Sequence, residues 1–283
     1  NKRRTFALIS LFLVFIIGLG WLFSRIYDNP AILIIAVIFS LVQSLISYYY
    51  SDSITLLASR ARQVPRKEPF MDLHQAVENL AITAGIPKPK IFLIEDTAPN
   101  AFATGRDPKH AAVAVTTGLL DKLNKRQLEG VIAHELSHVG NYDIRLMTLV
   151  VVLVGAIALA SDWFLRSLWF RGRDDDNKQG SGYFLLIGII LAILAPIAAM
   201  LIQLAVSRKR EYLADASGAL LTRFPEGLAE ALEIIAKDKE PLEAANRATA
   251  HLYIANPLKN IKVSPWFSTH PPIQDRIKRL RTM

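Results

Sequence analysis

Two histidines four residues apart, with a glutamate between them, are the residues of the chain best suited to chemistry. They lie in the stretch His134-Glu135-Leu136-Ser137-His138. Residues four apart share one face of a helix, so both imidazoles can bind one zinc ion while Glu135 reaches a water molecule beside it. Such a carboxylate can take the proton of the water as it attacks an amide carbonyl, and pass it to the leaving nitrogen. The competing interpretation is a chance pairing of these residues on a solvated helix.

A catalytic zinc ion usually has three protein ligands and an open position, so this site requires a third ligand. The chain has no cysteine, which leaves histidine or a carboxylate for that role. The stretch Arg210-Glu211-Tyr212-Leu213-Ala214-Asp215 supplies Glu211 as a candidate ligand. Asp215, one turn later on the same face, can accept a hydrogen bond from a ligand imidazole. The alternative is a surface cluster of ion pairs between Glu211 and the neighbouring basic residues.

The zinc motif is predicted to lie on a helix of some 15 residues that follows Asn124. Asn124 and Gln127 have the residue types and the spacing of an N-cap with its capping box. Apolar residues then recur at helical spacing until Gly140, at Leu128, Val131, Ile132 and Leu136. The motif therefore belongs to a capped, amphipathic helix outside the most apolar runs of the chain.

Further elements are predicted on both sides of this helix. Upstream, residues 70–84 form an amphipathic helix that stops at Gly85. Residues 90–95 and 111–116 have strand character and are joined by a loop that holds residues 100–105. Downstream of Val206 the chain is expected to be wholly helical, with prolines between helices at 208–221, 226–237, 242–253 and 273–281.

Two pairs of apolar segments account for a hydrophobic content of 52% in 283 residues, too high for an ordinary soluble enzyme. Residues 6–23 and 31–50 are runs of 18 and 20 uncharged residues and predict a transmembrane hairpin. A cleaved signal peptide is the alternative for the first run. The second pair is 146–161 and 183–206. Because its first member is short, this pair either crosses the membrane or forms a shallow hairpin buried in protein.

We therefore expect four regions: a transmembrane hairpin at 1–50, a catalytic part with the zinc-binding helix at 51–145, the second apolar pair at 146–206, and a helical part at 207–283 that supplies the third ligand. The net charge of +8 does not indicate nucleic-acid binding, because the basic residues lack interleaved aromatics. Eleven Lys and Arg residues flank the apolar segments on one side and five on the other. The positive-inside rule then places 51–145 and 207–283 together in the cytoplasm.

Four short stretches, taken together and in this order, resemble a known family: N-A-F-A-T-G at 100–105, H-E-L-S-H at 134–138, R-E-Y-L-A-D at 210–215 and S-T-H-P-P-I-Q-D-R at 268–276. They look like those of the HtpX family, bacterial membrane-bound zinc endopeptidases related to the eukaryotic CAAX prenyl endopeptidases. The resemblance covers nearly the whole chain. It implies an α-helical integral membrane protein with an α+β gluzincin-like zinc-metalloprotease domain at the cytoplasmic face of the bacterial inner membrane. It also implies polypeptide substrates, in the quality control of misfolded or damaged membrane proteins under stress.

The resemblance also implies roles for particular residues. His134, His138 and Glu211 become the ligands of one zinc ion, Glu135 the general base, and Asp215 the partner of the His134 imidazole. The segment Asn100-Ala101-Phe102 resembles an edge strand on which an extended substrate adds as a further strand, with a plain loop as the alternative. His270 and Arg276 match positions that face the zinc ion and can stabilise an oxyanion, with a cap on the final helix as the alternative.

Three functional hypotheses remain. The leading one is a membrane-anchored endopeptidase that acts at the cytoplasmic surface. A protease that cuts within the bilayer needs its zinc motif inside a hydrophobic span, whereas charged residues surround this one. A non-catalytic scaffold, in which zinc only joins two helices, has no need of Glu135, since a structural zinc site usually has four protein ligands and no base.

Overall fold

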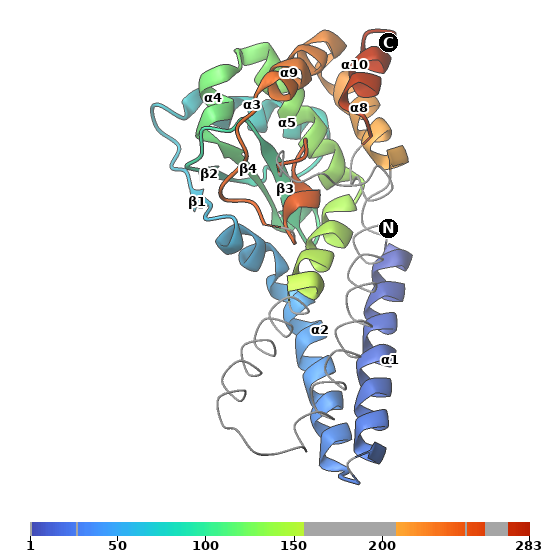
Figure 1. Cartoon of the computed structure of the whole chain (residues 1–283). Helices are drawn as coiled ribbons and strands as arrows, with labels where there is room; N and C mark the ends of the chain where they lie inside the picture. The colour runs from blue at the N-terminus through green and yellow to red at the C-terminus, as the bar shows by residue number, and fades with distance from the viewer. Residues whose placement is uncertain (1, 27, 156–207, 247, 258–270) are drawn as a thin grey trace, which may run out of the picture.

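The computed structural model describes residues 2–26, 28–155, 208–246, 248–257 and 271–283 (Figure 1). A helical hairpin leads into a four-stranded sheet that is surrounded by helices. The elements are α1 (Lys2–Ile26), α2 (Ala31–Ala58), β1 (Arg62–Gln63), α3 (Met71–Thr83), β2 (Lys90–Ile94), β3 (Ala101–Gly105), β4 (Ala111–Thr116), α4 (Thr117–Lys122), α5 (Lys125–Gly140), α8 (Arg208–Thr222), α9 (Pro225–Lys237) and α10 (Ile273–Leu280), with 3₁₀ turns η1 (Pro108–His110) and η2 (Ala250–Leu252). Residues 143–155 are also helical.

Helices α1 and α2 run antiparallel, side by side, away from the sheet (Figure 1). Helix α2 turns small hydroxyl side chains inward, among them the buried Ser40, Ser47 and Thr55, and exposes large apolar ones such as Ile35 and Leu45. Among the residues described, α2 is the one helix whose length and composition suffice to cross a membrane, and Thr5–Gly18 of α1 is a shorter apolar stretch. Helices in lipid typically place small polar residues at their contacts with other helices and apolar residues on their outer surface.

The sheet has the strand order β1-β2-β4-β3. Strand β2 is parallel to β4, while β1 pairs with β2 and β3 pairs with β4 in antiparallel fashion. Strand β3 is an edge strand, with Ala101 opposite Val115 and Gly105 opposite Ala111. The prediction that residues 100–105 form a loop is therefore wrong. Two alanines and a glycine give this segment weak strand character, and its pairing with β4 decides its conformation.

Both faces of the sheet are covered. Val113 and Val115 of β4 face the larger core, which they share with Val131 and Ile132 of α5 and with apolar residues of α3, α8 and α9. Ala112 and Ala114 face a second core that contains residues of α2, the 143–155 helix and the 242–253 segment. Because neither face meets water, β4 reads as an unbroken apolar run rather than an alternating one.

Helix α5 begins and ends as the sequence predicts. The Asn124 side chain accepts from the Gln127 backbone N–H at 3.1 Å, and the Gln127 side chain accepts from the Asn124 N–H at 3.0 Å. This capping box satisfies two of the free N–H groups of the first turn. The helix runs for 16 residues and ends at Gly140, close to the predicted length.

The helices predicted near 208–221, 226–237 and 273–281 are confirmed as α8, α9 and α10, but the helix predicted for 242–253 is wrong. In that segment the structure has turns and the short η2. The carboxylate of Asp96 accepts from the N–H groups of Glu243 and Ala244, and the Asn246 side chain accepts from those of Ala248 and Thr249. Side chains thus take the N–H groups that a helix would use for its own carbonyls.

The second apolar pair is described only at its start. Residues 143–155 form a helix whose apolar side chains, such as Leu146 and Leu153, pack against Leu8 and Phe12 of α1. Residues 156–207, which contain the 183–206 segment, lie outside the described residues.

Candidate metal centre

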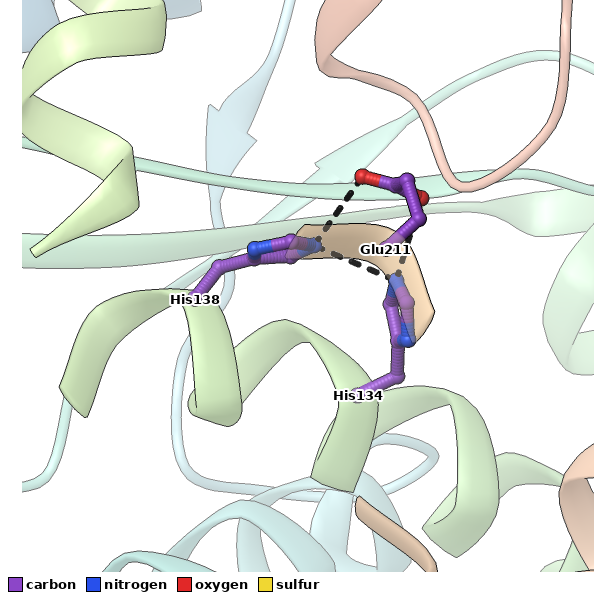
Figure 2. Close-up of side chains that lie close together, drawn as sticks. All are labelled: His134, His138 and Glu211. Carbon is purple, nitrogen blue, oxygen red and sulfur yellow. Dashed lines mark hydrogen bonds and ion pairs between the residues drawn. The ribbon is translucent and has the colours of Figure 1, made fainter. Parts of the chain in front are cut away.

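Two helices bring three metal-binding side chains together (Figure 2). His134 and His138 project from α5, and Glu211 projects from the first turn of α8. One ligand atom from each of the three residues lies within 4.8 Å of the others. All three side chains are buried. The interpretation of Glu211 as part of a surface ion-pair cluster is therefore wrong.

A glycine allows α8 to approach α5 at this point. A methyl group on Gly218 would lie 3.0 Å from the backbone N of His134, closer than ordinary packing allows. Gly218 follows Glu211 by two helical turns, so the two residues lie on the same side of α8. The close contact at Gly218 thus sets how near Glu211 stands to the two imidazoles.

Two carboxylates orient the histidines from behind. The Nδ1 atom of His134 lies 2.9 Å from Asp215 Oδ1, and the Nδ1 atom of His138 lies 3.1 Å from Asp143 Oδ2. An imidazole that donates its Nδ1–H to a carboxylate keeps its lone pair on Nε2. Both Nε2 atoms point into the space in front of Glu211, where a metal ion would take their lone pairs.

The distances among these donor atoms fit a tetrahedral zinc ion. The two Nε2 atoms are 3.3 Å apart, and Glu211 Oε1 and Oε2 lie 3.5 and 3.8 Å from the Nε2 atoms of His138 and His134. Zinc bonds of about 2.0–2.1 Å at tetrahedral angles place two ligand atoms about 3.3 Å apart. A carboxylate and two imidazole nitrogens that face one another form a buried pocket in which a cation is stabilised. These three residues therefore fit a zinc ion.

Glu135 is fully buried beside this cluster, with a carboxylate oxygen, Oε1, that has no hydrogen-bond partner among the described residues. The backbone of Ala103, on β3, lies beside the carboxylate and acts to lower its pKa. Burial raises the pKa of Glu135 to about 7, and the nearby Glu211 carboxylate acts in the same direction. An acceptor oxygen thus remains available next to the metal-binding atoms.

Burial and charge act differently on the two histidines. Burial lowers the pKa of His134 despite its hydrogen bond to Asp215, and the positive charge of Arg276 adds to the effect. For His138 burial also disfavours the charged form, but the hydrogen bond to Asp143 and the Glu211 carboxylate outweigh it and raise the pKa to about 9. The site is thus electronegative on the His138 side, where a cation is stabilised.

Arg276 is 1% exposed and lies against the metal-binding residues, with its Nη1 3.7 Å from Glu211 Oε2 and its Nη2 3.4 Å from His134 Nε2. Its Nε and Nη2 atoms donate to the two oxygens of Asp215 at 2.9 and 2.7 Å, and its Nη1 donates to the carbonyl of Ile254 at 2.7 Å. Burial acts to raise the pKa of Asp215, but the Arg276 charge outweighs this effect and holds the pKa below its usual range. Arg276 therefore fixes the partner of His134 and does not cap α10. His270 lies outside the described residues.

The segment predicted to hold substrate lies along the site as an edge strand. The side-chain amide of Asn100 donates to the carbonyl of Ala255 at 3.1 Å, and the Ala101 carbonyl accepts from the Ile254 N–H at 3.0 Å. The Phe102 ring turns into the second core and packs edge-on against Tyr253. A substrate on this strand would therefore meet backbone groups and the Asn100 amide rather than the Phe102 ring.

Two participants were missed by sequence reasoning. Asp143 follows His138 by five residues, beyond the end of α5, where helical spacing predicts no contact. An acidic residue just past the turn after Gly140 was the available signal. The second is the Ile254–Ala255 backbone, whose contacts with β3 have no signal in residue type.

A helix bearing His-Glu-x-x-His, packed on a second helix that adds a glutamate and an aspartate, defines a metallopeptidase. The chain belongs to peptidase family M48, whose model matches residues 67–283. It is 47% identical to a "Protease HtpX homolog" of Caldanaerobacter subterraneus subsp. tengcongensis, over 100% of this chain and 95% of the relative. A protein of the same description from Pyrococcus abyssi is 49% identical over 98% of this chain and 94% of its own length. The resemblance to the HtpX family is confirmed, and the chain is a metalloprotease.

A solved structure shares the fold. The crystal structure of S. mikatae Ste24p matches 99% of this chain and 67% of its own chain with a TM-score of 0.51 at 22% identity. The described part of the chain thus has the M48 metalloprotease fold, with helices around a mixed sheet.

Proposed function

We propose that this metalloprotease is a membrane-anchored zinc endopeptidase that cleaves misfolded or damaged membrane proteins at the cytoplasmic face of the bacterial inner membrane. The observation that carries the proposal is the convergence of His134, His138 and Glu211, with the free carboxylate oxygen of Glu135 beside them. A purely structural zinc site would need a fourth protein ligand and no such carboxylate.

One zinc ion per chain would be held by His134, His138 and Glu211, with Asp215 and Asp143 fixing the two imidazoles. When bound there, zinc acts as a Lewis acid and brings the pKa of water close to neutrality. Glu135 takes a proton from the attacking water as the C–O bond forms at the scissile carbonyl. It then gives that proton to the leaving nitrogen as the C–N bond breaks.

The substrate would be an extended, locally unfolded polypeptide. Strand β3 is the edge of the sheet on the side of α5, and Ala103 in its middle contacts Glu135. A peptide that adds to this edge is bound through its backbone hydrogen bonds, so its side chains contribute little to its recognition. Such recognition suits a protease of misfolded proteins better than one of a single folded target. His270 is proposed, from the family resemblance, to stabilise an oxyanion together with Arg276.

The membrane anchor would be the hairpin predicted at residues 1–50, which α1 and the greater part of α2 form, with residues 146–206 as a second embedded pair. Apolar side chains cover the outside of α2 while hydroxyl groups lie inside, which favours a lipid environment. The basic residues Lys2, Arg3 and Arg4 begin α1 at the end of the hairpin nearer the sheet (Figure 1). This arrangement supports a cytoplasmic position for the catalytic parts at 51–145 and 207–283.

Metal analysis of the detergent-purified full chain, coupled to cleavage of casein, tests this proposal. We expect about one zinc ion per chain, loss of cleavage when a chelator removes it, and recovery when zinc is returned. His110→Ala, which removes an exposed histidine outside the site, is a matched control and should behave like the wild type. Cleavage that persists in the metal-free protein would refute the proposal.

A further inference from the structure

A short segment of the chain lies against the edge strand that we propose to bind substrate. This segment, residues 252–255, is called the strap. The Ile254 N–H donates to the Ala101 carbonyl at 3.0 Å, and the Ala255 carbonyl accepts from the Asn100 side-chain amide at 3.1 Å. The Ile254 carbonyl accepts from Arg276 Nη1 at 2.7 Å. Both hydrogen-bonding groups of the Ile254 backbone are therefore engaged by residues at the site.

The contact with Ala101 is made on the free side of β3. Strand β4 pairs with the other side, where the Thr116 N–H donates to the Asn100 carbonyl at 3.0 Å. The Ala101 carbonyl, one residue later, points the opposite way, because neighbouring backbone groups alternate along a strand. It is the kind of edge group on which an extended peptide from another chain would pair.

The rest of this edge has no backbone partner of that kind among the described residues. Ala103 lies beside the Glu135 carboxylate, and the Gly105 N–H makes a long contact of 3.4 Å with the Thr148 hydroxyl. The strap therefore occupies one end of the edge, at Ala101, and does not pair with the part of the edge next to Glu135.

The strap is close to the metal centre as well as to the edge. Arg276 holds the Ile254 carbonyl with one nitrogen and Asp215 with two others, and Asp215 bonds to His134. A peptide carbonyl in the place of the Ile254 carbonyl would be bound by the same guanidinium. The contacts of the strap are thus those that an extended substrate backbone would make there: one carbonyl acceptor, one amide donor and one guanidinium donor.

We propose that the strap is an internal occupant of the substrate-binding edge, which an extended polypeptide displaces when it binds. This inference rests on the proposed function and adds a form of self-inhibition to it. Displacement exchanges three polar contacts for three equivalent ones, so their loss is compensated by the incoming backbone. What resists it is apolar packing on both sides of the sheet. Leu252 and Tyr253 are buried in the second core, with the Tyr253 and Phe102 ring centroids 5.0 Å apart, and Ile254 and Ala255 are buried in the larger core.

The absence of native cysteine allows the strap to be locked in place. In the full-length double variant Ala101→Cys/Ile254→Cys, a short thiol crosslinker should join the strap to β3. We expect casein cleavage to fall at least about tenfold and to return when a cleavable crosslinker is reduced, since a locked edge cannot pair with substrate. Gln63→Cys/Phe92→Cys, a facing pair on β1 and β2, is the control crosslink and should leave cleavage unchanged. Undiminished cleavage by the locked strap variant would overturn the inference.

Hydrogen exchange supplies a readout that does not depend on cleavage or on the cysteine variants. In the Glu135→Gln protein loaded with zinc, the Ile254 amide should be protected and should exchange at least about tenfold faster when an extended peptide is bound in excess. Equal protection with and without bound peptide would identify the strap as a fixed wall and refute the inference. A wild-type protein that binds zinc but cleaves nothing would refute the proposed function and the strap with it. Cleavage unaffected by the locked strap refutes the strap alone.

Discussion

Asp143 lies just beyond the end of the zinc-motif helix and accepts a hydrogen bond from His138 Nδ1 at 3.1 Å. Its other oxygen is 3.6 Å from Arg210 Nε, next to the candidate ligand Glu211. Asp143 is also the first residue of the helix at 143–155, which packs against α1. One buried carboxylate therefore connects the metal centre to the helices of the proposed membrane anchor.

Asp143→Ala should weaken zinc binding about 10- to 100-fold, the usual effect of removing the carboxylate partner of a ligand histidine. Competition with a chromophoric chelator measures the affinity. Asp121→Ala, at an exposed position on α4, should bind zinc like the wild type. An unchanged affinity in Asp143→Ala would mean that this carboxylate does not orient His138.

Gly218→Ala should disturb the contact between α8 and α5, because the added methyl group would lie 3.0 Å from the His134 backbone N. We expect a loss of about 1–3 kcal/mol of stability, as for other overpacked positions, and a lower zinc content. Gly140→Ala is the matched control, since a methyl group there meets nothing within 4 Å. Thermal unfolding and metal analysis check both variants, and equal results for the two would contradict the role given to Gly218.

Arg276→Ala should destabilise the protein by about 3–5 kcal/mol, because it leaves the Asp215 carboxylate buried without its cation. The melting temperature in detergent reports this loss. Arg276→Lys should recover only part of it, since an ammonium group cannot donate two parallel hydrogen bonds to one carboxylate. A lysine variant as stable as the wild type would show that the paired geometry contributes nothing.

The topology prediction is tested by labelling single cysteines in whole cells. Lys178→Cys, between the two members of the second apolar pair, should react with a membrane-impermeant maleimide from outside the inner membrane. Lys67→Cys, in the proposed cytoplasmic part, should react only after permeabilisation. Reaction of Lys178→Cys only after permeabilisation would show that residues 146–206 do not cross the membrane.

The sequence predicted those features that local patterns determine. Helix α5 follows from its capping box and apolar spacing, and the closeness of Asp215 to His134 follows from placing it one turn after Glu211. Residue pattern alone predicted a loop in place of β3 and a helix at 242–253, because distant partners decide their conformation, β4 in the first case and Asp96 in the second; the edge strand at Asn100-Ala101-Phe102 was indicated only by the family resemblance. The contact of Asp143 with His138 depends on a chain reversal after α5 that residue spacing does not describe.

The most direct test of the account is the Glu135→Gln variant, which removes the proposed base and leaves the three metal-binding residues in place. We expect it to retain about one zinc ion per chain and to lose detectable cleavage of casein, since removal of a catalytic base costs at least about 10²-fold in rate. His134→Ala, in contrast, should lose zinc and cleavage together. Full proteolysis by Glu135→Gln protein of confirmed zinc content would contradict the account.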